Sequence, residues 1–463
     1  MSHEAWNAVG RRAPLSQRKL VALAASFVWK WLFLLDVTLA GASMVLSHAL
    51  SPVAVVRPFS PEALGAAVVF AVSFSIAAYA GGLYDGRIGI RGMALLARLS
   101  VAALVAAATT LAFFYVAYYQ PLGRRVIIGA VLLASPLMLL PRLALHRLLR
   151  LRRTRVLFVG HSELTVRLVR AIERQRVPLY EVVASWPPPG RSPGSAEEVV
   201  ALCRESEVDE IVIPARTSDL WPVLVSALHC LPLGCHIRSD VDFHESLLSA
   251  VPVGHVAPDW VLSRGFDTSS AAGEALKRAS DVAIACFLLV LLSPFFVLGI
   301  AAVWLGRDGP VFFSQVRVGR YGRPFRIFKL RSMKMDAEAS GPQWAQPGDD
   351  RRTRAGEWLR RARLDELPQL VNILLGDMSI VGPRPERPEF VATLEQEIPY
   401  YGWRHVVRPG LTGWAQINHP YGANVQDARR KLEYDLFYIR HHSLVNDLSI
   451  VLRTIEASLR GGR

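Results

Sequence analysis

Cysteine is scarce in this chain. Its 463 residues include only four cysteines, Cys203, Cys230, Cys235 and Cys286. So few thiols exclude a disulfide-stabilised scaffold. The stretch HCLPLGCH, residues 229–236, superficially resembles a zinc site, but the sequence has no second ligand pair at zinc-site spacing. We therefore expect neither disulfides nor a structural zinc ion.

Acidic residues are outnumbered as well. The chain has 39 of them against 53 lysines and arginines, and its formal net charge is +14. Such a balance suits nucleic acid, an anionic membrane surface or phosphorylated substrates. The sequence lacks the basic and aromatic pattern of a nucleic-acid-binding module, so nucleic acid is not an expected partner. The hydrophobic content of 51% is gathered in long runs, which favours membrane lipid and a phosphorylated substrate.

Four apolar runs crowd the first 150 residues. They cover about 31–50, 63–83, 94–118 and 126–145. Each is close to the ~20 residues that a helix needs to cross a bilayer, so residues 1–150 are predicted to form a four-helix transmembrane bundle. Basic residues gather in the head, in the loop near 84–98 and after the fourth run, which predicts that both ends of the bundle lie in the cytoplasm. Asp36 in the first run is expected to hydrogen-bond a neighbouring helix.

Residues 151–265 are predicted to form a soluble, Rossmann-like α/β module. The stretches TRVLFVG, 154–160, and VDEIVIPA, 208–215, are typical of buried parallel strands, and a helix of 3.6-residue period follows the first. The dinucleotide fingerprint fails, because Gly160 is followed by His-Ser-Glu-Leu instead of further glycines. We therefore expect a degenerate module without a nucleotide site.

A fifth apolar run, 280–306, is also long enough to span a membrane. Lys277 and Arg278 precede it and a dense basic region follows it, so a crossing helix would leave that region outside, against the charge bias. Ser293 and Pro294 lie near its middle, and a proline bends a helix because it lacks an N–H and clashes with the preceding turn. We expect a re-entrant helix that enters and leaves by the cytoplasmic face. An ordinary kinked span is the alternative.

The segment 310–334, PVFFSQVRVGRYGRPFRIFKLRSMK, follows directly. Its pattern predicts a hairpin of strands 311–318 and 324–331. Because side chains two apart share one face of a strand, Lys329 and Arg331 are predicted to form an anion clamp. A basic strand that contacts lipid headgroups is the alternative.

The segment 363–385, RLDELPQLVNILLGDMSIVGPRP, contains the adjacent carboxylates Asp365 and Glu366. Leucines at helical spacing and a nearby proline place the pair at a helix start or bend. Neighbours diverge by about 100° on a helix, so the two carboxylates should have separate roles. Two loops stiffened by glycine and proline then present Arg384 and Arg408.

This composition suits phosphoryl transfer at a membrane. Arginines neutralise a diphosphate, and a carboxylate acts at the phosphorus with Mg²⁺ or as the nucleophile itself. A salt-bridged surface helix would also explain the paired charges, but not the recurrence of rigid arginine-bearing loops around them.

Four stretches together resemble the bacterial sugar transferases, which are monotopic polyprenyl-phosphate hexose-1-phosphate transferases. The stretches are KRASDVAIACFLLVLLSPFF, PVFFSQVRVGRYGRPFRIFKLRSM, RLDELPQLVNILLGDMSIVGPRP and RPGLTGWAQI. The resemblance covers about 273–463 and implies an α+β monotopic catalytic domain with a re-entrant membrane helix at 280–306. The front half resembles that of the long members, the undecaprenyl-phosphate glucose or galactose phosphotransferases.

The resemblance implies a two-step reaction. Asp365 matches the family nucleophile, which attacks the β-phosphate of a UDP-sugar and releases UMP. Undecaprenyl phosphate then accepts the sugar phosphate. Glu366 matches the partner carboxylate, and the two carboxylates are expected to hold a Mg²⁺ cofactor. The other expected site residues are Lys329, Arg331, Arg384 and Arg408 for phosphate binding, with Ser293 and Pro294 at the break in the re-entrant helix.

The expected donor is UDP-glucose, because the glucose branch of this family is common. The product would begin exopolysaccharide, capsule or lipopolysaccharide O-antigen assembly at the bacterial inner membrane. A membrane-bound nucleotide-sugar dehydratase shares such a front half, but it needs a second glycine-rich fingerprint and a Tyr-x-x-x-Lys pair, which the sequence after residue 270 lacks. A non-catalytic polysaccharide-export scaffold is the third hypothesis, and a homodimer stays open.

Overall fold

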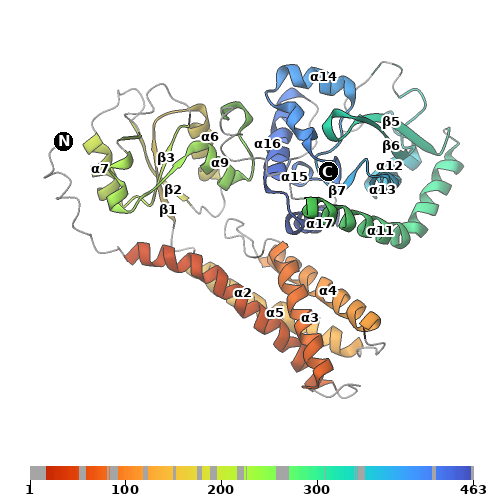
Figure 1. Ribbon diagram of the computed structural model, residues 1–463, viewed down its shortest axis with the longest axis horizontal. Helices are drawn as coiled ribbons and strands as arrows, with labels where there is room; N and C mark the ends of the chain where they lie inside the picture. The colour runs from red at the N-terminus through yellow and green to blue at the C-terminus, as the bar shows by residue number, and fades with distance from the viewer. Residues whose placement is uncertain are drawn as a thin grey trace. The chain divides into compact units, whose positions relative to one another are not determined.

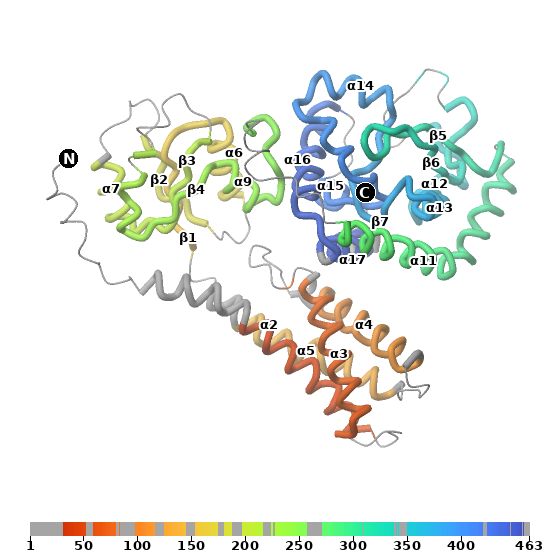
Figure 2. The backbone as a smooth tube through the Cα atoms, viewed as in Figure 1, coloured from red at the N-terminus to blue at the C-terminus, as the bar shows by residue number. Residues whose placement is uncertain are grey.

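A computed structural model gives the fold. It describes residues 17–51, 59–80, 83, 92–117, 124–149, 153–174, 180–187, 196–215, 224–225, 227–256, 271–307, 309–337, 339, 341, 350–419 and 424–459. The chain divides into two compact units, residues 1–247 and 248–463. Figures 1 and 2 show the helices and strands of each unit.

Four long helices begin the first unit. They are α2 (Gln17–Leu50), α3 (Pro61–Ala80), α4 (Gly92–Ala117) and α5 (Arg124–Leu149). Alanines together with Phe70 and Phe74 are buried where the helices pack, whereas Leu104 and Leu132 face outward and are exposed. A helix that is apolar on both its inner and its outer face suits a lipid environment. All four helices are long and apolar enough to cross a membrane, as the sequence predicts.

Asp36 joins the first helix of this bundle to the last. It is fully buried on α2, where the Arg142 Nη1 atom on α5 donates to its Oδ1 atom at 2.8 Å and the Nη2 atom donates to its Oδ2 atom. The predicted hydrogen bond to a neighbouring helix is confirmed, and its donor is a cation. Removing either partner would leave a buried charge uncompensated.

A parallel sheet forms the second part of this unit. It contains β1 (Thr154–Val159), β2 (Tyr180–Trp186), β3 (Glu210–Ile213) and β4 (His236–Ser239). They lie in the order β2-β1-β3-β4 (Figure 2). The helices between and after them are α6 (Glu163–Arg174), α7 (Ala196–Glu205) and α9 (Asp240–Leu248). The two predicted parallel strands are confirmed as the neighbours β1 and β3.

The order of the strands reverses between β1 and β3, which is where open sheets of this kind bind ligands. Here a carboxylate lies at that point. Asp240, which is 3% exposed, accepts a hydrogen bond from the Ser162 hydroxyl at 2.9 Å and another from the Ala215 N–H at 2.8 Å. The Asp240 side chain thus joins the segment after β1 to the segment after β3.

The second unit combines helices with two small sheets. Its longer helices are α11 (Ala271–Gly306), α12 (Arg354–Arg361), α14 (Pro388–Glu397), α16 (Val425–His441) and α17 (Leu444–Leu459). Shorter helices are η2 (Val253–His255), η3 (Arg320–Gly322), η4 (Leu364–Glu366), α13 (Gln369–Leu375), η5 (Tyr401–Val406) and α15 (Trp414–Asn418). β5 (Phe312–Val318) pairs antiparallel with β6 (Pro324–Leu330), which confirms the predicted hairpin. β7 (Ser379–Val381) pairs parallel with β8 (Gly410–Thr412).

Helix α11 is continuous over 36 residues, with Pro294 inside it. Its outward side chains are strongly exposed, such as Val290 at 77%, and it is the fifth helix long and apolar enough to cross a membrane. Its axis changes direction along its length (Figure 1). The Ser293 hydroxyl donates to the Val290 carbonyl oxygen at 2.8 Å, so it serves one of the carbonyls near the proline. The bend agrees with the predicted effect of proline, whereas re-entry into the membrane stays a prediction.

Candidate active site

Asp365 and Glu366 lie together in the single turn of η4, between α12 and α13. The buried side chains of Leu359 and Leu364 hold this turn against the inner face of α11 and β6. Pro368 follows as the N-cap of α13. The acidic pair therefore lies at a helix start, as the sequence predicts.

Glu366 is bound by two cations. The Arg384 Nη2 atom is 2.5 Å from its Oε1 atom, and the Lys329 Nζ atom is 3.6 Å from the same oxygen. Burial by itself would raise the pKa of Glu366, but Arg384 and Lys329 outweigh burial and hold that pKa at about 2. Glu366 is therefore an ionised carboxylate fixed in place by its partners.

Asp365 has a different environment. Its side chain is buried, with 6% exposed, and among the described residues its carboxylate accepts no hydrogen bond. Burial and the neighbouring charge of Glu366 raise its pKa, while Lys329, Arg360 and Arg384 oppose that rise. An unbonded carboxylate near cations keeps its lone pairs available for an incoming electrophile.

Lys329 reaches the acidic pair because Asn372 ties β6 to α13. The fully buried Asn372 donates from Nδ2 to the Arg326 carbonyl oxygen at 2.7 Å and accepts from the Phe328 N–H at 3.0 Å. These bonds fix the strand on both sides of Ile327 and so fix Lys329 opposite the pair. Burial lowers the pKa of the Lys329 ammonium, an effect that Glu366 partly opposes.

Arg384 follows a tight crossing of two backbones. A Cβ atom on Gly382 would lie 2.3 Å from the Arg408 carbonyl oxygen, so only glycine fits there. The Arg404 Nη2 atom then donates to the Arg384 carbonyl oxygen at 2.9 Å. The same guanidinium group pairs with buried Asp435, since its Nη2 atom is 2.8 Å from Oδ2. These contacts fix the backbone from which Arg384 extends to Glu366.

The start of α11 holds both arms of this site. Arg278 donates to the carbonyl oxygens of Ile373 and Leu374 at the end of α13, the latter at 2.7 Å. Asp281, which is 1% exposed, accepts from the Ile380 N–H of β7 at 3.2 Å. The predicted membrane helix is thus bonded to the helix after the acidic pair and to the strand before Arg384.

Two predicted phosphate-binding residues, Arg331 and Arg408, contact backbone carbonyl oxygens. Arg331 follows the end of β6, donates to the Pro310 carbonyl oxygen at 2.7 Å and lies over the Phe313 ring. Arg408 donates from Nε to the Gly376 carbonyl oxygen at 3.2 Å. Within the described residues, the structure thus brings together Asp365, Glu366, Lys329 and Arg384, without Arg331 or Arg408.

Sequence reasoning missed Asn372 and Arg404, which position the site without touching the acidic pair. A local pattern could not single them out, because the site segments that they hold are 20 to 46 residues away in sequence. It also missed Glu386, whose only signal is its place two residues after Arg384.

Comparisons with known proteins show which proteins this chain is similar to. The family pattern described as Bacterial sugar transferase matches residues 272–461. A UDP-N-acetylgalactosamine-undecaprenyl-phosphate N-acetylgalactosaminephosphotransferase of Aeromonas hydrophila is 41% identical over 258 residues, which are 55% of this chain and 59% of that protein. A UDP-glucose:undecaprenyl-phosphate glucose-1-phosphate transferase of Escherichia coli K12 is 42% identical over 193 residues, 41% of this chain and 42% of that protein.

The chain thus aligns with about half the length of these two relatives. A third, a UDP-glucose:undecaprenyl-phosphate glucose-1-phosphate transferase of Caulobacter vibrioides, is 44% identical over 185 residues, 40% of this chain and 69% of the relative. The alignment to the family covers every residue of the acidic pair and its cations. This chain belongs to the bacterial sugar transferase family.

Proposed function

We propose that the protein transfers a hexose 1-phosphate from a UDP-sugar to undecaprenyl phosphate, with UDP-glucose as the expected donor. One observation carries the proposal: the buried Asp365 carboxylate, which accepts no hydrogen bond from the described residues, lies beside a Glu366 carboxylate held by Arg384 and Lys329. The names of the relatives, which include glucose and N-acetylgalactosamine transferases, support the same reaction.

In the first step, an oxygen of Asp365 attacks the β-phosphorus of the donor. The bond between that phosphorus and the bridging oxygen breaks, and UMP leaves with the bridging oxygen and its electron pair. The sugar phosphate is then bound to Asp365 as an acyl phosphate. In the second step, a phosphate oxygen of undecaprenyl phosphate attacks the same phosphorus and the Asp365 carboxylate leaves. The product is undecaprenyl-diphosphate-hexose, and no net proton is consumed.

The remaining residues position the phosphates and neutralise their charge. Lys329 and Arg384 already contact Glu366, so a bound diphosphate would share these cations with it. We propose that Glu366 holds both cations in place for the phosphates. We assign Arg331 and Arg408 no step, because their contacts lie elsewhere.

A Mg²⁺ ion fits the donor set of this site. Magnesium commonly uses one or two carboxylates together with substrate phosphates and water. Asp365 and Glu366 supply two carboxylates. The described residues contain no group of three or more His, Cys, Asp or Glu side chains that could hold a metal, so the remaining ligands would come from substrate phosphates and water. When bound, the ion would neutralise diphosphate charge and polarise the phosphoryl group.

We place the reaction on the cytoplasmic face of the bacterial inner membrane. The asymmetry of basic residues around the four-helix bundle supports this orientation. The bent and apolar helix α11 would bring the site to the lipid-borne acceptor. The product would serve as the first sugar-lipid of exopolysaccharide or O-antigen assembly.

The test uses the full chain in membranes with undecaprenyl phosphate and a panel of UDP-sugars. We expect UMP release, a mass increase equal to one hexose phosphate on Asp365 with donor alone, and a loss of about a thousandfold or more in Asp365→Asn. Asp350→Asn, an exposed aspartate, is the matched control and should keep the wild-type rate. UMP release that persists in Asp365→Asn would refute the covalent route. Release from no donor would favour the scaffold instead.

A further inference from the structure

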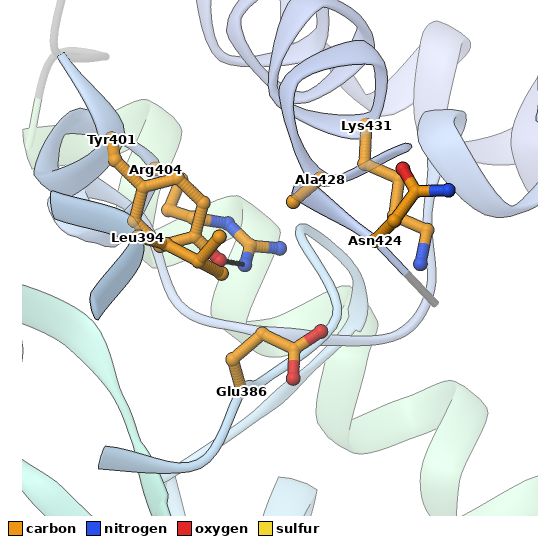
Figure 3. Close-up of a pocket in the computed structure, with 7 residues that line it drawn as sticks. All are labelled: Glu386, Leu394, Tyr401, Arg404, Asn424, Ala428 and Lys431. Atoms are coloured by element: carbon orange, nitrogen blue, oxygen red, sulfur yellow. Dashed lines mark hydrogen bonds between the residues drawn. The ribbon is translucent and has the colours of Figure 1, made fainter. Parts of the chain in front are cut away.

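A small polar pocket lies beside the candidate active site. Its cavity has a volume of about 20 Å³, which is room for about one or two water molecules. Its lining residues are Glu386, Leu394, Tyr401, Arg404, Asn424, Ala428 and Lys431. Figure 3 shows the Glu386 carboxylate directed into the space between two walls, with Tyr401 and Arg404 on one side and Asn424 and Lys431 on the other.

Glu386 is close to the phosphate-binding arm. It follows Arg384 by two residues, so the two Cα atoms lie within about 7 Å of each other. Its backbone is fixed, because the Val318 N–H of β5 donates to its carbonyl oxygen at 2.9 Å. The Arg317 Nη1 atom lies 3.7 Å from the Glu386 Oε2 atom. Burial lowers the pKa of Lys329 and the charge of Arg317 lowers it further, so Arg317 lies near both the pocket and the site. A group attached to a phosphate between Lys329 and Arg384 therefore starts near this pocket.

Arg404 connects the pocket to the same arm. Its guanidinium group lines the pocket and donates to the Arg384 carbonyl oxygen and to Asp435. Its Nη1 atom also lies 2.7 Å from the Tyr401 hydroxyl oxygen. The guanidinium group thus has three hydrogen-bond partners, which fix this wall of the pocket.

The chemistry of the lining selects for hydroxyl groups. Glu386 offers a carboxylate acceptor, and the Lys431 ammonium group lies across the pocket from it. A hydroxyl both donates and accepts, so it can bond to the carboxylate and to a donor opposite at the same time. A phosphate would meet the negative charge of Glu386, and a whole sugar ring exceeds a cavity of about 20 Å³.

We propose that this pocket receives one or two ring hydroxyls of the hexose of the donor, and that Glu386 sets the preference of the enzyme among hexoses. The Glu386 side chain is 21% exposed, and an epimer that leaves its carboxylate without a hydrogen bond is disfavoured. This inference rests on the proposed function, since it assumes a nucleotide-linked hexose whose phosphate lies between Lys329 and Arg384.

The experiment measures kcat/KM for UMP release from UDP-glucose, UDP-galactose and UDP-N-acetylgalactosamine, using the full chain in lipid nanodiscs with undecaprenyl phosphate. The variants are Glu386→Gln, which keeps the shape and removes the charge, and Lys431→Met, which removes the opposing ammonium. Glu397→Gln, an exposed residue on the neighbouring α14, is the matched control. Inhibition by UMP is measured for every variant, because UMP contains the uridine moiety and no hexose.

We expect Glu386→Gln to lower kcat/KM for the preferred donor about tenfold or more, to change the other two donors less, and to leave the UMP inhibition constant unchanged. The control should match the wild type on all three donors. If Glu386→Gln does not fold, the same kinetic measurements on Lys431→Met test the inference, with the same loss for the preferred donor expected.

Three results would overturn the inference. An equal loss for all donors together with weaker UMP inhibition would assign the pocket to the uridine moiety. Unchanged kinetics in folded variants would leave a pocket that holds only water. Wild-type protein that releases UMP from no donor would remove the proposed reaction, and this inference with it, whereas the first two results leave the reaction standing.

Discussion

At the scale of single residues, two adjacent carboxylates acquire opposite properties from their surroundings. Glu366 has two cationic partners and a pKa of about 2. Asp365 has no hydrogen bond from the described residues, and its pKa is raised by burial and by Glu366. The two carboxylates can therefore have separate roles, because Glu366 positions the cations and Asp365 can react.

The pH dependence of the first step should be bell-shaped. Asp365 must be ionised to attack, and its pKa is raised above the ordinary 3.8, so the rate falls as pH drops through that raised pKa. Lys329 must be protonated, and its pKa is lowered below the ordinary 10.5, so the rate falls again as pH rises through that lowered pKa. The UMP burst with donor alone, measured against pH, tests both limbs without the acceptor.

Lys329→Arg separates the two limbs. An arginine stays protonated across the accessible range, so the alkaline limb should move to higher pH while the acid limb stays in place. An alkaline limb that does not move in this variant would assign it to another group. Lys334→Arg, the same change on a neighbouring lysine without a role in the site, should leave the whole profile as in the wild type.

At the scale of elements, short β7 sets the position of Arg384. Asp281 accepts from its Ile380 N–H, and the Tyr438 hydroxyl donates to its Val381 carbonyl oxygen at 3.1 Å. The same hydroxyl shares its one proton with the Asp447 Oδ1 atom at 2.9 Å, and Asp447 pairs with Lys277 at 2.9 Å. The strand is therefore fixed from α11, α16 and α17, and a shift of one of these helices would move Arg384.

Tyr438→Phe should lower kcat about tenfold with little change in KM for the donor, because a small displacement of a catalytic arm is costly. If this effect acts through Arg384, it should disappear when Arg384→Ala is already present. A double-mutant cycle on kcat measures this coupling. The same fold loss in both backgrounds would mean that Tyr438 supports the fold and does not position Arg384.

Helix α11 gives a second test at this scale. Pro294→Ala restores a backbone N–H inside the helix and removes the clash with the preceding turn. We expect a straighter helix and a smaller fraction of protein with its C-terminal part on the cytoplasmic face. Protease accessibility in sealed vesicles of known orientation measures that fraction. Ser293→Ala, beside the proline, should change it less, and a fraction untouched by Pro294→Ala would argue against re-entry.

At the scale of the whole molecule, the second unit includes residues that precede α11. The Ser249 carbonyl oxygen accepts from Trp414 Nε1 at 2.9 Å, and the Val251 N–H donates to the Glu433 carbonyl oxygen at 2.9 Å. Val251 and Val253 are buried, at 0% and 1% exposed. The segment 249–256 thus contributes to the core of the unit that carries the site.

A chain of residues 248–463 should therefore release UMP within about tenfold of the full chain, because the acidic pair and its cations all lie within one compact unit. A chain that begins at residue 271 should lose several kcal/mol of stability, since it lacks the buried Val251, Val253 and Val256. It also lacks the backbone hydrogen bond to Glu433 and the bond from the Trp414 indole to Ser249. Thermal unfolding and UMP release of both truncations test this. Equal melting temperatures would mean that the segment adds nothing to the unit.

Much of this architecture follows from local pattern. Four apolar runs of membrane length become α2 to α5, alternating apolar residues become β5 and β6, and the proline after Glu366 places the acidic pair at a helix start. These features depend on neighbours within a few residues in sequence, whose preferences act whatever the rest of the chain does.

The sequence alone determined the membrane character of the chain, the order of its elements and the identity of the acidic pair, because these follow from local composition and spacing. The tertiary structure decided which cations meet that pair. Lys329 and Arg384 reach Glu366, whereas Arg331 and Arg408 bond to nearby carbonyl oxygens. The difference arises because the position of a cation depends on where its backbone segment packs. That packing depends on contacts such as Asn372 with β6 and Arg404 with Arg384, which join segments far apart in sequence.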